Sequence, residues 1–361
     1  MHRWLEAAAV YRDRRIIAIF FMGFSSGLPL ALTGATLGIW LREAHIDLAT
    51  IGFFALVGIA YNVKFLWAPV MDRAPVPGLT RWLGRRRSWA LVTQAALIGS
   101  LLALGHTEPA AEPVVTALWA VIVAFCSASQ DIVIDAFRIE LLEDHEQGVG
   151  AASTQYGYRA GMIVSGAGAL FAASYGGWAF AYTAMAACVL VGVATVLLTP
   201  EPRRAVEAGQ GMGREAVRFG RALKEAVADP FIDFMQRSGW VLILLFIVLY
   251  KMGDAVAGVM AGPFYIDTGF TKIEIAEVSK IYGVGATYLG IFVGSLIVYR
   301  LGLMKALLIC GVLQMLSNLM YAAQAVVGHD VAFLVATIGI ENVTGGMGSA
   351  AFVAYLSSLC N

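Results

Sequence analysis

Charged residues are scarce in this sequence. They make up 14% of its 361 residues, whereas hydrophobic residues make up 59%. A soluble domain averages about 25% charged and about 45–50% apolar residues, so this composition excludes an ordinary globular protein around one buried core. An excess of one charge sign is also lacking, because 25 Lys and Arg balance 25 Asp and Glu. The composition therefore gives no support for nucleic-acid binding, and we expect no such partner.

Cysteine and histidine are few. The cysteines lie in apolar stretches, with no CxxC pair and no histidine at metal-binding spacing, so we interpret them as packing residues and expect no metal and no cofactor. The histidines lie at the N-terminus, in loops and at expected helix ends, which argues against an enzyme. The residues are Cys126, Cys188, Cys310 and Cys360, and His2, His45, His106, His145 and His329.

A signal-peptide pattern is lacking as well. The first long apolar run begins at Ile16 and is long enough to span a membrane. A bilayer core of about 30 Å needs about 20 mostly apolar residues per helix. The chain has ten such runs, which predicts an all-α polytopic membrane protein with about ten transmembrane helices. The runs cover roughly 16–41, 49–71, 89–106, 114–137, 149–173, 178–198, 238–266, 275–299, 304–327 and 331–358.

Basic residues gather in alternate loops. The N-terminal segment and the segments 73–88, 138–148, 199–237 and 300–305 hold 19 of the 25 Lys and Arg, whereas the opposite loops hold Arg42 and Lys272. Cytoplasmic loops carry the excess of Lys and Arg. We therefore expect a multi-pass membrane protein, in contact with lipid, with a cytoplasmic N-terminus.

The long connection 199–237 divides the chain. We predict an N-terminal six-helix bundle (1–198), a cytoplasmic linker (199–237) and a C-terminal bundle (238–361). Apolar residues at helical spacing within the linker predict an amphipathic helix on the inner membrane surface, with a solvated tether as the alternative. These residues are Ala216, Phe219, Gly220, Leu223 and Val227.

The two halves of the chain also resemble each other in sequence, at an offset of 227 residues. Residues 46–51 lead into the second expected helix and resemble residues 273–278, which lead into the eighth, and Arg73 falls on Arg300. Parallel repeats are typical of transporters built from two related halves. A duplicated six-helix unit predicts two further helices beyond the ten, and without them we expect a severe loss of activity.

The loop after the second expected helix carries a charged motif. It runs Asp72-Arg73, a Pro/Gly-containing insert, then Gly84-Arg85-Arg86-Arg87. This resembles the cytoplasmic loop motif of the major facilitator superfamily, with a longer spacer. The resemblance implies a latch of Asp72, Arg73, Arg85 and Arg86 that holds helix ends together when the cytoplasmic side is closed. Simple topology anchoring by the arginines is the alternative.

Three longer blocks resemble the AmpG-type muropeptide permeases. They are FSSGLPLALT (24–33), KFLWAPVMDR (64–73) and AFCSASQDIVIDA (124–136). The resemblance covers essentially the whole chain. It implies a location in the inner membrane of a Gram-negative bacterium. It also implies import of anhydromuropeptides, the products of cell-wall turnover, from periplasm to cytoplasm, driven by the proton gradient. This import supports wall recycling and β-lactamase induction. More distant relatives include acetyl-CoA transporters.

Ionisable residues within the expected spans are costly, about 2.5–3.5 kcal/mol each on insertion scales, and mark a transport pathway or an ion pair. Asp131, Asp254 and Glu341 are our candidates for proton coupling. Lys64, Arg159 and Lys251 are candidates for binding substrate carboxylates. Structural pairing of Lys64 with Asp131, or of Lys251 with Asp254, is the alternative. For Asp135, near a helix end, we favour a structural pair with Arg138 or with the arginine-rich loop.

Polar and aromatic residues in the spans suit a sugar site, although each could instead bond a neighbouring helix. Those selected for substrate binding are Asn62, Gln130, Tyr61, Tyr158 and Asn342.

Glycine pairs four residues apart, at Gly23/Gly27, Gly34/Gly38, Gly157/Gly161 and Gly290/Gly294, predict closely packed helices.

The hypothesis is a proton-driven secondary transporter of the major facilitator type that works as a monomer by alternating access and carries GlcNAc-anhydroMurNAc-peptides. A transporter for another large anion, such as a CoA ester, and a non-transporting membrane sensor are the alternatives.

Overall fold

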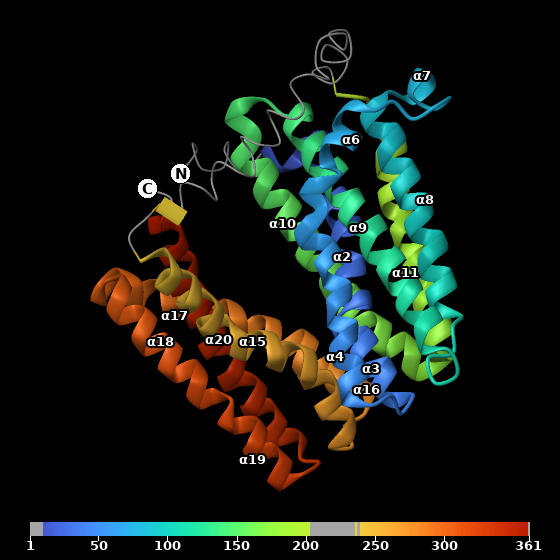
Figure 1. The fold of residues 1–361 in the computed structure, drawn as a ribbon. Helices are drawn as coiled ribbons and strands as arrows, with labels where there is room; N and C mark the ends of the chain where they lie inside the picture. Colours follow the sequence, from blue (N-terminus) through green and yellow to red (C-terminus); the bar gives the residue numbers. More distant parts are fainter. Residues whose placement is uncertain (1–9, 203–234, 237–238, 360–361) are drawn as a thin grey trace.

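The computed structural model describes residues 10–202, 235–236 and 239–359, and these residues form helices and short loops without any strand (Figure 1). The all-α prediction is confirmed. The amphipathic helix predicted within the linker lies outside the described residues, as does Cys360. Of the other cysteines, Cys126 and Cys310 are buried, Cys188 is half-buried, and all three are free thiols.

One group of helices comes from the N-terminal half of the chain. Short turns connect its members, and several transmembrane segments are built from two or more consecutive helices. The members are α2 (Arg14–Thr33), α3 (Ala35–Glu43), α4 (Leu48–Phe54), η2 (Ala55–Gly58), α5 (Ile59–Val63), η3 (Lys64–Leu66), α6 (Ala68–Arg73), α7 (Thr80–Leu83), α8 (Arg85–Gly105), α9 (Pro113–Leu141), α10 (Gln147–Ile163), the π-helix η5 (Val164–Gly168) and α11 (Ala169–Leu198).

The second group comes from the C-terminal half. It begins after the linker and contains a second π-helical segment. The members are α15 (Trp240–Asp267), α16 (Lys272–Glu274), the π-helix η7 (Ile275–Tyr282), α17 (Gly283–Leu301), α18 (Leu303–Ser317), α19 (Leu319–Val327) and α20 (Val331–Leu359).

Nine segments of the described chain are long and apolar enough to cross a membrane. One of them, Gln147–Leu198, has 52 residues and contains two of the predicted runs, 149–173 and 178–198. Gly177 interrupts it with a left-handed φ of 77°, which lets the chain turn back. These nine segments agree with the predicted ten spans, because one of them contains two of the predicted runs.

Closely packed glycines bring helices together in both groups. A Cβ added to Gly157 or Gly161 of α10 would collide with backbone carbonyls of α2. A Cβ at Gly290 or Gly294 of α17 would collide with the backbone of α20. The close helix packing predicted from the glycine spacing is therefore confirmed at these pairs, where backbones approach each other without side chains between them. The packing at Gly34/Gly38 is looser, because a Cβ at Gly38 would lie 3.9 Å from its nearest neighbours on α15.

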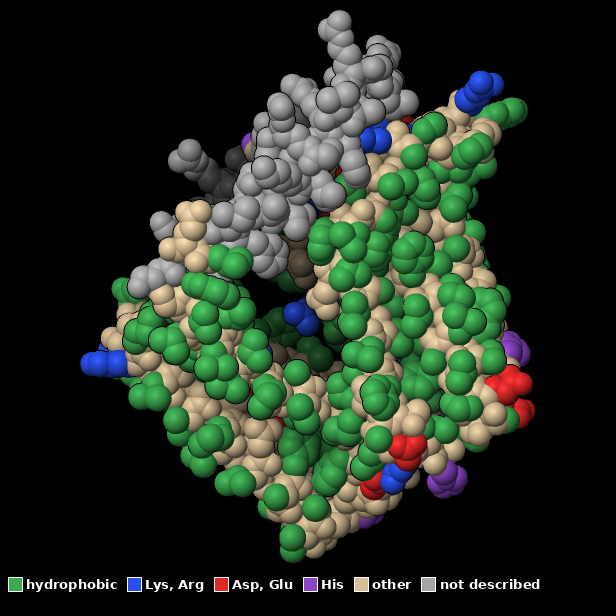
Figure 2. All heavy atoms as spheres, in the orientation of Figure 1, with side chains coloured by type: hydrophobic (Ala, Val, Ile, Leu, Met, Phe, Trp, Pro, Cys, Tyr) green, Lys and Arg blue, Asp and Glu red, His purple; other side chains and the backbone are tan. Residues whose placement is uncertain are grey.

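The two groups meet at one end and diverge at the other (Figure 1). At the diverging end, α6 ends at Arg73 and α8 begins at Arg85; we call it the arginine-rich end. At the opposite end α3 and α4 pack against α15, and α11 packs against α16. Figure 2 shows a hollow between the groups with a basic side chain inside it. This hollow is the space that both groups of helices could offer to a solute.

Candidate functional site

Asp131 lies where three segments of the N-terminal group converge. It is 9% exposed on α9 and accepts a hydrogen bond from the Ser26 hydroxyl of α2. The Lys64 ammonium, at the start of η3, lies 3.6 Å from its other carboxylate oxygen. The pairing of Lys64 with Asp131, which the sequence left as an alternative, is therefore present. Asp131 therefore joins α2, η3 and α9 through its side chain.

Other polar groups surround this pair. Tyr61 lies 3.4 Å, oxygen to oxygen, from the Thr33 hydroxyl. Gln130 donates to Ser25 over 3.4 Å, and its own buried side-chain oxygen has no partner. Tyr158 interacts electrostatically with Asp131 and with Arg159. The structure thus gathers several of the selected residues around Asp131.

Asn62 stands apart from this group. It is exposed, and its amide donates over 3.4 Å to the Gly58 carbonyl of its own segment.

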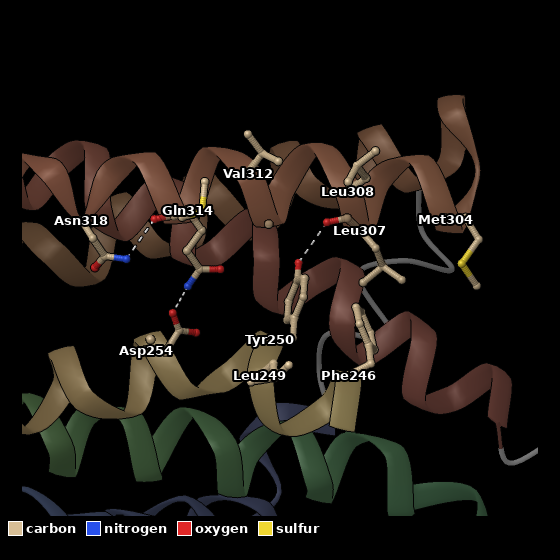
Figure 3. Close-up of a pocket in the computed structure, with 13 residues that line it drawn as sticks. Phe246, Leu249, Tyr250, Asp254, Met304, Leu307, Leu308, Val312, Gln314 and Asn318 are labelled. Atoms are coloured by element: carbon tan, nitrogen blue, oxygen red, sulfur yellow. Dashed lines mark hydrogen bonds between the residues drawn. The ribbon is translucent and has the colours of Figure 1, made fainter. Parts of the chain in front are cut away.

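The C-terminal group holds a second charged cluster. Lys251 donates to Asp254 over 2.8 Å and to Ser349 of α20 over 3.1 Å. Gln314 of α18 donates to the other Asp254 oxygen, as Figure 3 shows. The ammonium of Lys251 also lies 5.4 Å from the centre of the Phe352 ring. Asp254 and Lys251 therefore bond three helices of one group together, and the alternative of an i,i+3 pair is present.

A cavity of about 530 Å³ lies beside Asp254, between α15 and α18 (Figure 3). Its wall is mostly apolar, with Phe246, Leu249 and Leu308 among the lining residues. Asp254 and Gln314 supply its polar side together with Asn318, which donates to the Gln314 carbonyl over 3.2 Å. This space differs from the hollow between the two groups, because α15 and α18 belong to the same group.

Glu341 lies on α20 without an ion pair among the described residues. It accepts a hydrogen bond of 3.0 Å from Asn342, whose oxygen accepts one of 2.8 Å from Thr287 of α17. Glu341 also interacts electrostatically with Asp254 and with Lys280. Of the three carboxylates selected for proton coupling, Glu341 therefore has the fewest fixed partners.

The arginine-rich end carries a network of ion pairs. Arg86 is 4% exposed and donates to Asp72 over 2.8 Å and to Glu140 over 2.5 Å. Arg85 lies 4.0 Å from Glu140. Glu201, just after α11, accepts the backbone N–H of Arg86 over 2.8 Å. The network therefore ties α6, α8, α9 and the end of α11 together within one group of helices.

The opposite end is closed by charges from both groups. Arg42 of α3 lies 2.5 Å from Asp267 of α15, and Lys272 of α16 lies 2.6 Å from Glu43 of α3. Trp178 donates to Glu43 over 2.5 Å, and the Lys272 ammonium lies 5.5 Å from its ring centre. These contacts, which we call the inter-group lock, join the halves at the end where the hollow is shut.

Several partners in these clusters were not predicted from the sequence. Glu140 and Glu201 bind the arginines from positions 54 and 115 residues away, and Gln314 binds Asp254 from 60 residues away. A single sequence gives no sign of such pairs, because they depend on the packing of helices. Lys280 could have been found by the rule that marked the other ionisable residues, since it lies within the predicted run 275–299.

Comparison with known proteins decides the family. The family model described as Major Facilitator Superfamily matches residues 19–361. The chain belongs to the major facilitator superfamily. The anhydromuropeptide permease of Escherichia coli K12 is 43% identical over 354 residues, which cover 98% of this chain and 69% of the permease. A putative transporter, AmpG 4 of Rickettsia felis, is 36% identical over 357 residues, covering 98% of this chain and 84% of the relative.

Solved structures agree on the fold. The nucleoside transporter NupG has a TM-score of 0.65 at 14% identity and covers 94% of this chain and 82% of its own. A D-xylose–proton symporter has a TM-score of 0.62 at 14% identity, with coverage of 95% and 82%. The superfamily match and the permease relative identify the chain as a membrane transporter rather than an enzyme. The resemblance to AmpG-type permeases is confirmed.

The three blocks that carry that resemblance meet in space. Ser26 belongs to the block 24–33, Lys64 to 64–73 and Asp131 to 124–136, and Asp131 contacts both of the other side chains. Trp67 of the second block also donates to Ser129 of the third over 3.0 Å. The permease-like sequence is thus concentrated around one buried carboxylate.

Proposed function

We propose that the chain imports anhydromuropeptides from the periplasm into the cytoplasm, driven by protons. The observation that carries this proposal is 43% identity, along 98% of the chain, to a protein named as an anhydromuropeptide permease. The arginine-rich end is then cytoplasmic, in a bacterial inner membrane, because basic residues are retained on that side. The transporter acts as a monomer, with its solute path between the two groups of helices.

In this proposal the structure corresponds to a state open to the cytoplasm. The inter-group lock closes the periplasmic end, and the hollow opens toward the arginine-rich end. Alternating access requires a second state in which the lock is broken and the arginine-rich ends of the two groups approach each other. The Asp72–Arg86–Glu140 network would then serve as the latch, together with Arg73 and Arg85. It would hold α6, α8 and α9 in a fixed arrangement for that contact.

Proton coupling is assigned to Asp131, with Glu341 and Asp254 as further candidates. Asp131 is supported by its burial and by its contacts with Ser26 and Lys64. A proton on Asp131 would free Lys64 from its ion pair, so protonation and the position of the α4–η3 segment are linked. Lys64 and Lys251, together with Arg159, Asn62, Gln130, Tyr61, Tyr158 and Asn342, are assigned to the substrate path.

Counterflow in proteoliposomes tests the substrate. Vesicles loaded with unlabelled GlcNAc-anhydroMurNAc-tripeptide should take up the labelled compound without any pH gradient, and the E. coli permease serves as the positive control. A CoA ester in the lumen should not support this exchange. Exchange with the CoA ester but not with the muropeptide would assign the chain to a different large anion. No exchange with either, beside an active E. coli permease, would overturn transport of these solutes.

A further inference from the structure

Four basic residues lie well inside the spans: Lys64, Arg159, Lys251 and Lys280. Two of them form ion pairs with described residues, and two do not. Lys64 and Lys251 are held by Asp131 and Asp254 at 3.6 Å and 2.8 Å. Neither Arg159 nor Lys280 lies within ion-pair distance of an acidic group among the described residues. A cation in a membrane protein without a fixed counter-charge is costly and is placed where water or a ligand can reach it.

Lys280 lies at the contact between the two groups of helices. It belongs to the π-helix η7, which packs against the π-helix η5 of the N-terminal group. Its aliphatic stem passes Gly166 of η5, with the nearest stem carbon 3.7 Å from the place of a Cβ on that glycine. π-Helical segments are rare and are frequently found at functional sites. Here one such segment from each half forms a junction, and Lys280 crosses it.

The depth of Lys280 places it at the closed base of the hollow. It is eight residues from Lys272, a residue of the inter-group lock, which corresponds to about 12 Å along the helix. Its side chain is half-buried. Its ammonium makes no hydrogen bond to a described residue and is not fully enclosed. Glu341 acts on it electrostatically from α20 but does not form an ion pair with it.

Arg159 faces away from its packed neighbour. Gly157 and Gly161 of α10 lie against α2, and Arg159, two residues from each, points about 200° around the helix from that contact. It is exposed, and an arginine in a span turns to water rather than lipid because of the cost of burial in hydrocarbon. It lies seven residues before Gly166, about 10 Å nearer the arginine-rich end. The two cations therefore lie at different depths in the same molecule, one from each half.

We propose that Lys280 and Arg159 bind separate acidic groups of the transported solute, Lys280 at the base of the hollow and Arg159 on its wall. This inference rests on the proposed function and adds to it a requirement for two carboxylates at different positions on the solute. A peptide that carries several carboxylates along its length fits such an arrangement. Because the two residues come from different halves, a bound dianion would also join the halves, as transport by alternating access requires.

The test pairs a change in the protein with a change in the ligand. Calorimetric titration of the detergent-purified chain measures binding of GlcNAc-anhydroMurNAc-tripeptide and of the same compound with its carboxylates converted to carboxamides. The wild type should prefer the acid form. Lys280→Met should weaken binding of the acid form about tenfold to a hundredfold, the range for a hydrogen bond to a charged group, and leave the carboxamide form unchanged. Lys305→Met, at an exposed position of α18, is the matched control and should change neither.

Further variants separate charge from structure. Lys280→Arg should keep most of the preference for the acid form. Arg159→Gln should reduce that preference by a similar factor, and it carries the test if Lys280→Met does not yield folded protein. Equal loss of both ligands in Lys280→Met and Arg159→Gln would overturn the inference, as would a wild type that binds both forms equally. A wild type that binds neither form would overturn the proposed function itself.

Discussion

The carboxylate of Asp131 lies between the hydroxyl of Ser26 and the ammonium of Lys64, and so connects α2, η3 and α9. Each of these residues comes from a different block of sequence, and the pair sits on the side of the N-terminal group that also holds Tyr61 and Tyr158. A proton that binds there changes the charge balance of three helices at once.

Removing the charge of Asp131 should uncouple transport from protons. Asp131→Asn keeps the size of the side chain and a contact for Ser26, but it cannot take up and release a proton. We expect counterflow of solute to persist and accumulation against a gradient to disappear. Asp135→Asn is the matched control on the same helix, because Asp135 is exposed and pairs with Arg138 at 3.8 Å. Normal accumulation by Asp131→Asn would remove Asp131 from the coupling mechanism.

The inter-group lock should set the balance between the two states. Exposed or half-exposed ion pairs contribute about 0–1 kcal/mol each, so loss of Glu43–Lys272 should shift the populations by a few-fold rather than change the fold. In the double variant Glu43→Gln/Lys272→Met, we expect part of the population to open at this end. Electron–electron distance measurement between labels at Ala110 and Val326 should show a longer component.

An acidic residue close to the lock, but outside it, provides a control for this prediction. Glu274→Gln removes a nearby acid that caps its own segment through Thr271 and contacts His329 rather than the other group. It should leave the distance distribution unchanged. An unchanged distribution in the Glu43→Gln/Lys272→Met variant would show that these ion pairs do not hold the end closed.

Arg86 should be the most important member of the arginine network for stability. Its removal leaves Asp72 and Glu140 without their principal partner, and breaking a buried ion pair costs about 3–5 kcal/mol. Arg86→Met should lower the melting temperature in detergent by several degrees. Arg81→Met, at an exposed position on α7, should have little effect. Equal melting temperatures for the two variants would contradict the structural role of Arg86.

Substitution by alanine at two glycines of the same helix should have opposite effects on the melting temperature. A Cβ at Gly157 collides with the Phe20 carbonyl region of α2, whereas nothing lies within 4 Å of a Cβ at Gly148. Gly157→Ala should therefore separate α2 from α10 and lower the melting temperature. Gly148→Ala should raise it slightly, since alanine is favoured over glycine in a helix by about 1 kcal/mol. Thermal unfolding followed by intrinsic fluorescence distinguishes the two, and a neutral Gly157→Ala would refute the close packing.

The fold follows from features that a single sequence displays. The spans follow from apolar runs of about 20 residues, because a bilayer requires that length. Turn residues separate the spans, as Gly177 does between the runs 149–173 and 178–198. The close helix pairs could likewise be predicted from the spacing of Gly157/Gly161 and Gly290/Gly294. These features are local along the chain, so helix packing need not be known in advance.

The candidate site could be predicted less completely. The rule that ionisable residues in spans mark a pathway or a pair found Lys64 and Asp131, but it could not say which cations remain unpaired. Whether Lys251 is held by Asp254 and whether Lys280 is free depends on how α15, η7 and α20 pack. Partners such as Glu140 and Gln314 are distant in sequence and become visible only in the folded chain.

The central claim is that the chain couples solute import to protons, and accumulation in proteoliposomes tests it most directly. Labelled GlcNAc-anhydroMurNAc-tripeptide is offered on the side opposite the arginine-rich end. Uptake is measured with and without a proton gradient of about one pH unit, with the outside more acidic than the lumen. For one proton per solute, such a gradient can drive accumulation of about tenfold. We predict accumulation that approaches this value and collapses when a protonophore is added. Uptake that stops at equal concentrations under both conditions would contradict proton-driven import and leave a passive carrier.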